Sequence, residues 1–326
     1  MTRWTKMNFF WMMICIITLF FITGPFTTAL AGDYPDKPIR IIYPFPAGSG
    51  GDIATRVLAD AAGKQLGVPI KVSNVTGGRG TIGAAKVAQA KKDGYEIGSL
   101  PIGPALTQPI FSAKLPYKTD DLEPICQFTY LPIVIVAGAH TPYKTIKGLV
   151  DYAKKNPGKV TYAHPGLGTV PYLMLKALET ATNIKMKGVP FKGLRPGVTA
   201  VVGGHVDLAL AVFAGAFGLQ KAGKVNILGV FAGKRMDLAP NIPTVEEDGV
   251  KTYPQLWTGI FAPNGTDPAA LKKLGSAFAK VIKSQGFAKA MSKAKLPVVY
   301  LDKSAFQKKI AADIKYFKAY KAKKKK

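Results

Sequence analysis

Residues 39–53 read Ile-Arg-Ile-Ile-Tyr-Pro-Phe-Pro-Ala-Gly-Ser-Gly-Gly-Asp-Ile. The apolar run Ile39–Tyr43 predicts a short strand that enters a glycine-rich loop, here called the first loop (residues 44–51). Asp52 is expected to cap the helix that follows. Glycines let backbone N–H groups approach a ligand closely, and the start of a helix carries partial positive charge. The pattern therefore predicts a strand, loop and helix arranged to bind an anion.

A related unit recurs at residues 160–181. Val160–His164 predicts a strand, and Pro165-Gly-Leu-Gly-Thr (residues 165–169, the second loop) leads into a second amphipathic helix. Thr169 is a suitable N-cap, and Pro171 falls in the first turn, where its missing N–H costs little. Two such loops could hold one small anion between them, which favours a solute receptor over a catalyst.

Residues 1–31 have the pattern of a secretory signal peptide. Arg3 and Lys6 give a basic start, residues 8–21 are almost wholly apolar, and Ala29-Leu-Ala31 provides a small-x-small cleavage pattern. We expect cleavage after this pattern, so that the mature chain begins at Gly32 and is soluble outside the cytoplasm. An uncleaved N-terminal anchor is the alternative.

The formal net charge is +26 over 326 residues, which attracts anions over a range that salt limits. Nucleic acid is a poor candidate partner because the chain is expected to be exported and its lysines are scattered. The terminal run Lys318–Lys326 is expected to be a solvated helix end and tail. Cys15 would leave with the signal peptide, so Cys126 would be alone and no intramolecular disulfide is expected.

Strand-like and helix-like segments alternate along the chain, which predicts α/β domains with largely parallel sheets. Predicted strands lie at residues 39–43, 70–75, 95–100, 133–137, 160–164, 188–191, 206–211, 226–232 and 254–263. Predicted helices follow the two loops and lie at residues 81–90, 146–156, 196–202, 268–283, 286–293 and 304–321.

Two domains are expected, because the chain leaves one sheet, builds a second and returns. Candidate hinges lie near residues 131–137 and 250–259. We therefore expect residues 32–134 and 254–326 to form domain 1, and residues 135–253 to form domain 2.

Enzyme motifs are weak in this chain. Gly78–Gly83 matches the dinucleotide fingerprint G-x-G-x-x-G, but the acidic partner at the end of the next strand is absent. Gly218–Lys224 resembles a P-loop, yet Val225 follows it and the order of helix and strand is reversed. The histidines at positions 140, 164 and 205 are scattered, so no catalytic residue, metal site or cofactor is predicted. An exported α/β enzyme acting on a small carboxylate and a polyanion-binding protein remain as alternatives.

Four motifs, in order along the mature chain, resemble the Bug/TctC family of periplasmic solute-binding proteins of tripartite tricarboxylate transporters. They are residues 34–40 (Tyr-Pro-Asp-Lys-Pro-Ile-Arg), 44–52, 93–95 (Asp-Gly-Tyr) and 203–207 (Gly-Gly-His-Val-Asp). The resemblance implies a type II-like periplasmic-binding-protein fold. Each of its two domains would be a mixed, mostly parallel sheet flanked by helices, and two crossover segments would join them.

The resemblance also implies a function and its partners. The protein would be a monomer that closes over a small organic anion, usually a carboxylate or dicarboxylate. It would then deliver this cargo to inner-membrane permease subunits. A role as a solute sensor is an alternative.

Family members generally hold a carboxylate with backbone amides and water between the two loops. Carried over by position, the implied ligand-binding residues are Phe45, Ala47, Gly48, Ser49 and Asp52 on the first domain and Gly166, Gly168 and Thr169 on the second. Tyr172 stands where relatives often have histidine, and Pro46 stands where a small residue is usual, so the ligand itself cannot be carried over.

Four further polar residues lie in or beside predicted loops. Arg79, Lys192 and Arg195 could add positive charge, although long basic side chains usually stay solvated. Asp207 is either a structural cap or a polar ligand contact. Of these four, Lys192 and Asp207 join Tyr172 on the list of candidate ligand-binding residues.

Overall fold

The structure is a computed structural model that describes residues 34–112, 114–237, 239–250 and 255–323. Residues up to Asp36 form a separate unit, and every element below belongs to residues 37–326. The predicted signal peptide and Cys15 lie outside the described residues. Within the described ranges, no helix is both long enough and apolar enough to cross a bilayer.

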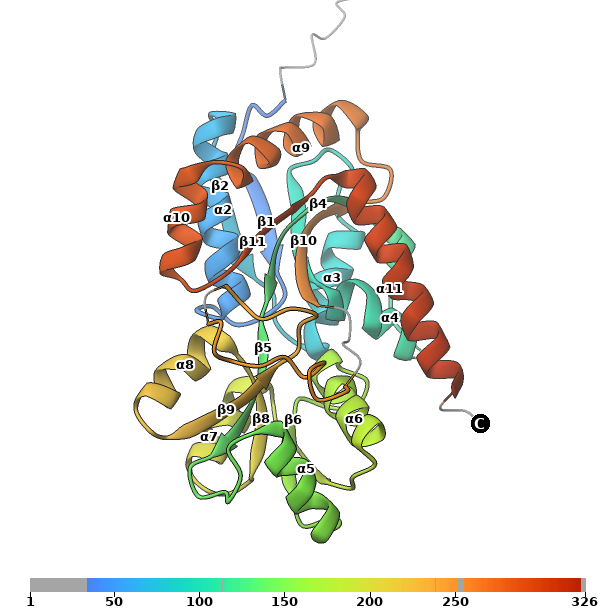
Figure 1. Ribbon diagram of the computed structural model, residues 1–326. Coiled ribbons are helices and arrows are strands. Elements are labelled where there is room, and N and C mark those ends of the chain that lie inside the picture. Colours follow the sequence, from blue (N-terminus) through green and yellow to red (C-terminus); the bar gives the residue numbers. More distant parts are fainter. Residues whose placement is uncertain (1–33, 113, 238, 251–254, 324–326) are drawn as a thin grey trace, which may run out of the picture. The chain divides into compact units, whose positions relative to one another are not determined.

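The first sheet has six strands in the spatial order β11-β4-β10-β3-β1-β2 (Figure 1). Its strands are β1 (Ile39–Tyr43), β2 (Ile70–Asn74), β3 (Glu96–Pro101), β4 (Leu122–Leu131), β10 (Leu256–Pro263) and β11 (Val298–Leu301). Its helices are α2 (Gly50–Leu66), α3 (Thr81–Ala88), α4 (Gln108–Phe111), α9 (Pro268–Ile282), α10 (Gln285–Lys293) and α11 (Lys303–Lys323), with short turns η1 (Gly78–Gly80), η2 (Gly103–Thr107) and η3 (Thr119–Asp121).

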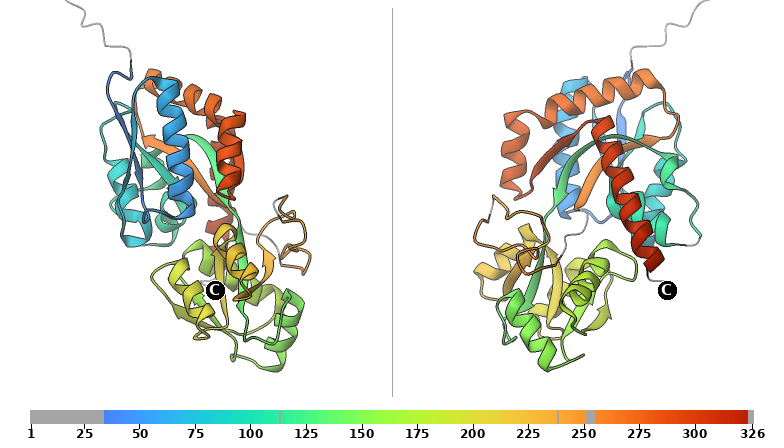
Figure 2. Two further views of the ribbon diagram at one scale, coloured as in Figure 1. Left: turned by 90° about the vertical axis from the view of Figure 1, so that its left-hand side faces the viewer. Right: turned by 45° about the vertical axis from the view of Figure 1, so that its right-hand side comes forward.

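Helices cover both faces of this sheet. The α2 helix packs with α9 and α10, whereas α3 and α11 share one apolar cluster on the opposite face (Figure 2). Right-handed crossovers produce this arrangement, because β1 to β2 moves outward along the sheet and β2 to β3 moves back.

The second sheet has five strands in the order β7-β6-β8-β5-β9. Its strands are β5 (Ile133–Gly138), β6 (Thr161–His164), β7 (Lys187–Pro190), β8 (Leu208–Val212) and β9 (Val225–Val230). Its helices are α5 (Ile146–Lys155), α6 (Val170–Thr182), α7 (Leu194–Val202) and α8 (Phe213–Lys221). Residues of α5 and α6 share one apolar cluster with one face of the sheet, and residues of α7 and α8 share another with the other face.

Both sheets are mixed, as expected, but less parallel than expected. The β1 strand pairs in parallel with β2 and β3, whereas β10 runs antiparallel to β3 and β4. In the second sheet, β6 pairs in parallel with β7 and β8, whereas β5 runs antiparallel to β8 and β9. The antiparallel pairs of β5 and β10 arise where the chain changes sheets, because these are the strands by which it enters the second sheet and re-enters the first. The β11 strand also runs antiparallel to β4.

The chain crosses between the sheets twice, and the role of these crossings as hinges remains a prediction. Pro132 separates β4 from β5, and residues 231–255 connect β9 back to β10. The C-terminal helix is then fastened to the first sheet: Trp257 Nε1 donates to Asp313 Oδ2 at 2.7 Å, and Phe306 packs edge-on against the same indole. The assignment of residues 32–134 and 254–326 to one domain and 135–253 to another remains a prediction.

Candidate functional site

The first loop follows the carboxyl end of β1 and leads directly into α2. The helix begins at Gly50, and Ser49 is its N-cap, with Ser49 Oγ accepting a hydrogen bond from the Asp52 N–H at 3.4 Å. The prediction that Asp52 caps this helix was therefore wrong by three residues. Asp52 instead lies in the first turn, with only 1% of its surface exposed.

The Asp52 carboxylate organises the first loop from beneath. Its Oδ2 accepts from the Gly48 N–H and from Arg56 Nε, both at 2.9 Å, and its Oδ1 accepts from Asn74 Nδ2 at 2.8 Å. Asn74 Nδ2 also lies 2.9 Å from the Phe45 carbonyl oxygen. Both carboxylate oxygens are thus occupied by protein donors, so Asp52 is placed to position the loop rather than to face a ligand.

Gly51 allows the start of α2 to lie directly on β1. A Cβ atom at this position would stand 2.1 Å from the Tyr43 hydroxyl, a separation that no side chain can tolerate. The Tyr43 side chain is buried, and burial raises its pKa to about 12. Glycine is therefore required here by close packing.

The second loop follows the carboxyl end of β6 and leads into α6. Thr169 occupies the predicted N-cap position, and its hydroxyl donates to the Gly166 carbonyl at 2.7 Å. The Gly166 N–H donates to His164 Nδ1 at 3.1 Å. Gly166 and Gly168 have φ values of 113° and 75°, a region that favours glycine. His164 therefore anchors the second loop much as Asp52 anchors the first.

His164 lies among aromatic rings. The ring of Tyr172 lies 5.1 Å from the imidazole and the ring of Tyr162 lies 5.8 Å from it. Burial lowers the pKa of His164 below its ordinary value of 6.5. An imidazole Nδ1 that accepts an N–H must also be unprotonated. Tyr172 thus packs against the group that holds the second loop.

Acid is expected to release the second loop. Because the folded-state pKa of His164 is lowered, the unfolded chain takes up the proton first as the pH falls. The contribution of neutral His164 to the stability of the folded chain is complete above pH 6.5 and is lost as the pH falls below it. Each pH unit of this fall changes the folding equilibrium constant by at most about tenfold. Urea unfolding measured from pH 8 to pH 5 checks this expectation. His164→Asn, which keeps an acceptor but cannot titrate, should show a flatter profile, and identical profiles would contradict it.

The amide donors that remain include Ser49 and Gly168, which the sequence pointed to, but not Gly48 or Gly166. Gly48 and Gly166 donate to Asp52 and His164, as described above. Within the described residues, no hydrogen-bond partner is found for the N–H groups of Ser49 and Gly50 on the first loop or of Leu167 and Gly168 on the second. In the part of the chain that is described, these four N–H groups are therefore unpaired donors on the two loops.

The two loops are linked across the two sheets. Arg79, in η1 beside the first sheet, donates from Nη1 to the Leu167 carbonyl at 3.2 Å. Arg195, in α7 beside the second sheet, donates from Nη2 to the Gly48 carbonyl at 3.2 Å. A Cβ on Gly168 would lie 3.4 Å from Phe111 of α4, so the second loop also approaches the first sheet directly. The structure therefore brings together the loops that the sequence predicted to converge.

Three candidates from the sequence lie less centrally. Ala47 is exposed in the turn of the first loop, and Lys192 is exposed after β7. Asp207 lies just before β8, where Oδ2 accepts from both the backbone N–H and the hydroxyl of Thr161 at 2.7 Å. Thr161 is the first residue of β6, at the opposite end of that strand from the second loop. The position of Asp207 supports its structural alternative and not a ligand contact.

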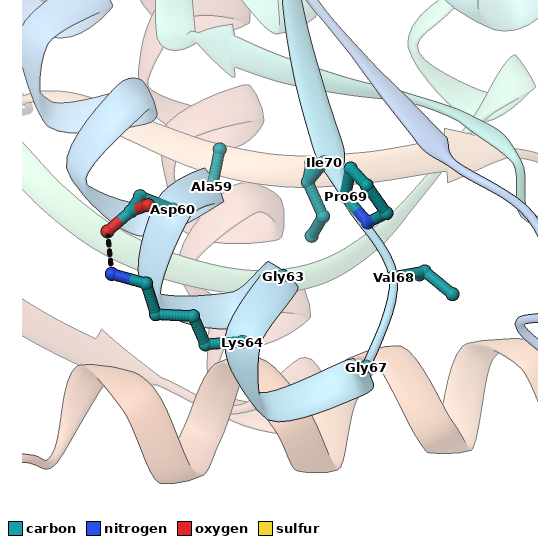
Figure 3. Close-up of a pocket in the computed structure, with 8 residues that line it drawn as sticks. All are labelled: Ala59, Asp60, Gly63, Lys64, Gly67, Val68, Pro69 and Ile70. Atoms are coloured by element: carbon teal, nitrogen blue, oxygen red, sulfur yellow. Dashed lines mark hydrogen bonds and ion pairs between the residues drawn. The ribbon is translucent and has the colours of Figure 1, made fainter.

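A surface hollow of about 430 Å³ lies elsewhere, at the end of α2 (Figure 3). It is lined by Ala59, Asp60, Gly63, Lys64, Gly67, Val68, Pro69 and Ile70. Its two charged side chains, Asp60 and Lys64, pair with each other at 2.8 Å. The hollow includes no residue of either loop and offers a ligand no unpaired charge.

The described residues support neither of two other kinds of site, a reactive cysteine and a metal centre. Cys126 is buried in β4, and burial raises the pKa of its thiol to about 12. Across the described ranges, no group of three His, Cys, Asp or Glu side chains is arranged to hold a metal ion.

Comparison with known proteins identifies the family. The model for the tripartite tricarboxylate transporter family receptor, TctC, matches residues 54–323. The chain belongs to this family. The TctC family consists of periplasmic solute-binding receptors and not enzymes, which confirms the receptor interpretation over the enzyme alternative.

Individual relatives are similar over most of their length. The UPF0065 protein in the gbd 5′ region of Cupriavidus necator is 31% identical over 298 residues, covering 89% of this chain and 88% of the relative. The structure of the periplasmic binding protein BugD is 30% identical, with a TM-score of 0.79 over 89% of this chain and 98% of that one. The structure of MatC from Rhodopseudomonas palustris with bound malate is 26% identical, with a TM-score of 0.77 over 88% and 99% of the two chains. The resemblance to the Bug/TctC family and its two-sheet binding-protein fold are thereby confirmed.

Sequence reasoning missed the groups that hold the first loop. Asn74 ends β2, which pairs in parallel with β1, so its side chain reaches the neighbouring loop. Arg56 stands one helical turn after Asp52, a spacing that places two side chains on one helix face. That i, i+4 spacing is visible in the sequence and could have identified Asp52 as a partner of Arg56.

Proposed function

We propose that this receptor captures a small organic carboxylate between its first and second loops in the periplasm. It then delivers the ligand to the inner-membrane subunits of a tripartite tricarboxylate transporter. The observation that carries the proposal is the pairing of the two loops: each offers amides without a protein partner, and each is contacted by an arginine from the other sheet.

The charge around the loops suits an anion. Arg79, Lys192 and Arg195 form no ion pair with a carboxylate in the part of the chain that the structure describes. Asp52, the buried carboxylate that accepts from the first loop, already forms an ion pair with Arg56. A ligand carboxylate would therefore meet unbalanced positive charge rather than repulsion.

The amides can supply the energy required. A hydrogen bond to a charged group contributes about 1.5–3 kcal/mol, so four such bonds can offset desolvation and the lost motion of the ligand. Micromolar affinity requires about 8 kcal/mol in total. Backbone donors held in place by Asp52 and His164 need little reorganisation, which lowers the cost of binding.

The MatC structure supports a dicarboxylate as the ligand class, since that relative was solved with malate. Malate, succinate and longer dicarboxylates are accordingly the first candidates. Tyr172, which packs against His164 at the second loop, is a residue expected to influence which of them fits.

Isothermal titration against a panel of mono-, di- and tricarboxylates tests the proposed function. We expect one molecule of a dicarboxylate per chain, micromolar affinity, no chemical change in the ligand, and no binding of its uncharged dimethyl ester. Lys64→Ala, at an exposed ion pair away from both loops, is the control and should bind as the wild type does. Binding that follows charge alone and disappears with moderate salt would instead support a polyanion-binding protein, and turnover would support an enzyme.

A further inference from the structure

The two sheets present an arginine in topologically equivalent places. In the first sheet, β1 ends in the first loop, and the adjacent parallel strand β2 leads to Arg79. In the second sheet, β6 ends in the second loop, and the adjacent parallel strand β7 leads to Arg195. Because parallel strands end at the same edge of a sheet, each arginine emerges beside the loop of its own sheet.

Each arginine nevertheless contacts the loop of the other sheet. Arg79 Nη1 donates to the Leu167 carbonyl, and Arg195 Nη2 donates to the Gly48 carbonyl, both at 3.2 Å. Arg79 also lies against the backbone of Gly166, because a Cβ built there would lie 3.6 Å from Arg79 Cδ and Nη1, at van der Waals contact. The two contacts are reciprocal, and each joins a charged donor to a loop backbone.

The backbone at Arg79 is specialised for this role. Its φ of 60° lies in the left-handed region, which non-glycine residues rarely adopt, between Gly78 at 56° and Gly80 at 92°. The Thr81 hydroxyl fixes this turn by donating to the Gly78 carbonyl at 2.8 Å. The backbone conformation of η1 therefore fixes the direction of the Arg79 Cα–Cβ bond.

We propose that Arg79 and Arg195 are a reciprocal pair of positioning residues that hold the two loops in their facing arrangement. This pair acts on the site of the proposed function and so rests on it for its effect on ligand affinity. Opening the site breaks both contacts at once. The pair therefore stabilises the form in which the two loops face each other, even without ligand. With ligand bound, the same two contacts slow its release.

Binding kinetics of Arg79→Ala, Arg195→Ala and the double variant test the role in ligand retention. Each single variant should weaken dicarboxylate binding by about 5- to 10-fold, mostly through faster dissociation, and the double variant by about 30- to 100-fold. Arg235→Ala is the matched control, because it also removes one exposed arginine, here paired with Glu247, and it should change the affinity by less than twofold. Unchanged dissociation rates in both single variants would overturn the proposal.

A distance measurement without ligand tests the same proposal independently of the proposed function. Spin labels at Lys64→Cys on α2 and Lys147→Cys on α5 report the separation of the two sheets, since both side chains are exposed. Cys15→Ser removes one of the two native cysteines, and the other, Cys126, is buried. The double arginine variant should show a broader distribution with longer distances than the wild type. Identical distributions in the two proteins would overturn the proposed role of the pair. If the double variant shows the broader distribution but the wild type binds no carboxylate, only the proposed function is contradicted.

Discussion

Replacing Gly51 by alanine is expected to weaken dicarboxylate binding by about 10- to 100-fold and to lower the free energy of unfolding by about 1–3 kcal/mol. The added methyl group would stand 2.1 Å from the Tyr43 hydroxyl, so the buried Tyr43 ring or the start of α2 must move. Movement at the start of α2 would displace the Ser49 and Gly50 amides, which are the proposed ligand donors of the first loop. Calorimetric titration and urea unfolding of the same variant measure the two effects.

Two variants show whether the collision is the cause. Gly286→Ala, near the start of α10, adds a methyl group at a position with nothing within 4 Å and should leave binding unchanged. Tyr43→Phe combined with Gly51→Ala removes the hydroxyl and should recover part of the lost affinity. If Gly51→Ala binds as tightly as the wild type, the added methyl group does not displace the proposed ligand donors, and this prediction is wrong.

Removing the Asp52 carboxylate is expected to have a comparable effect through a different route. Asp52→Ala leaves the Gly48 N–H, Arg56 and Asn74 without their common acceptor, which should cost about 2–3 kcal/mol of stability and at least tenfold in affinity. We expect a smaller loss of stability than for a fully buried ion pair, because about half of the Arg56 side chain is exposed. Asp60→Ala, which breaks an exposed pair on the same helix, is the control and should lose less than 1 kcal/mol.

The Asp52 carboxylate is also expected to make the free energy of unfolding depend on pH in acid. Burial alone would raise the pKa of Asp52, but hydrogen bonds from Arg56, Asn74 and Gly48 hold it below its ordinary value of 3.8. A lowered folded-state pKa means that the stabilisation is complete above pH 3.8 and is lost as the pH falls through the folded-state value. Acid unfolding of Asp52→Asn should lack this step. A step of equal size in both proteins would assign it to other carboxylates.

Local pattern was enough to predict the parts of the site that depend on neighbouring residues. The strand at residues 39–43 is observed with the predicted bounds, and both glycine loops follow strands and precede helices as expected. These features follow from apolar runs, glycines and caps within about fifteen residues of one another. The same information also gave the family, because the motifs appear in order along the chain.

Features that depend on distant contacts could not be read in this way. The ten-residue strand β4 was not predicted, because Pro124, Gln127 and Thr129 interrupt its apolar pattern although all three are buried. Its burial comes from β10 and β11, more than a hundred residues later in the chain. The crossed contacts of Arg79 and Arg195 join residues 88 and 147 positions apart, so nothing local indicates them.

The central claim is that one carboxylate is held by amides from both loops at the same time. Titration of malate or another bound dicarboxylate into protein labelled with ¹⁵N-glycine measures this most directly, because Gly50 and Gly168 report on one loop each. We predict that both resonances shift together with a single dissociation constant, while Gly286 stays unchanged. Shifts confined to one loop, or to glycines of neither loop, would contradict the account.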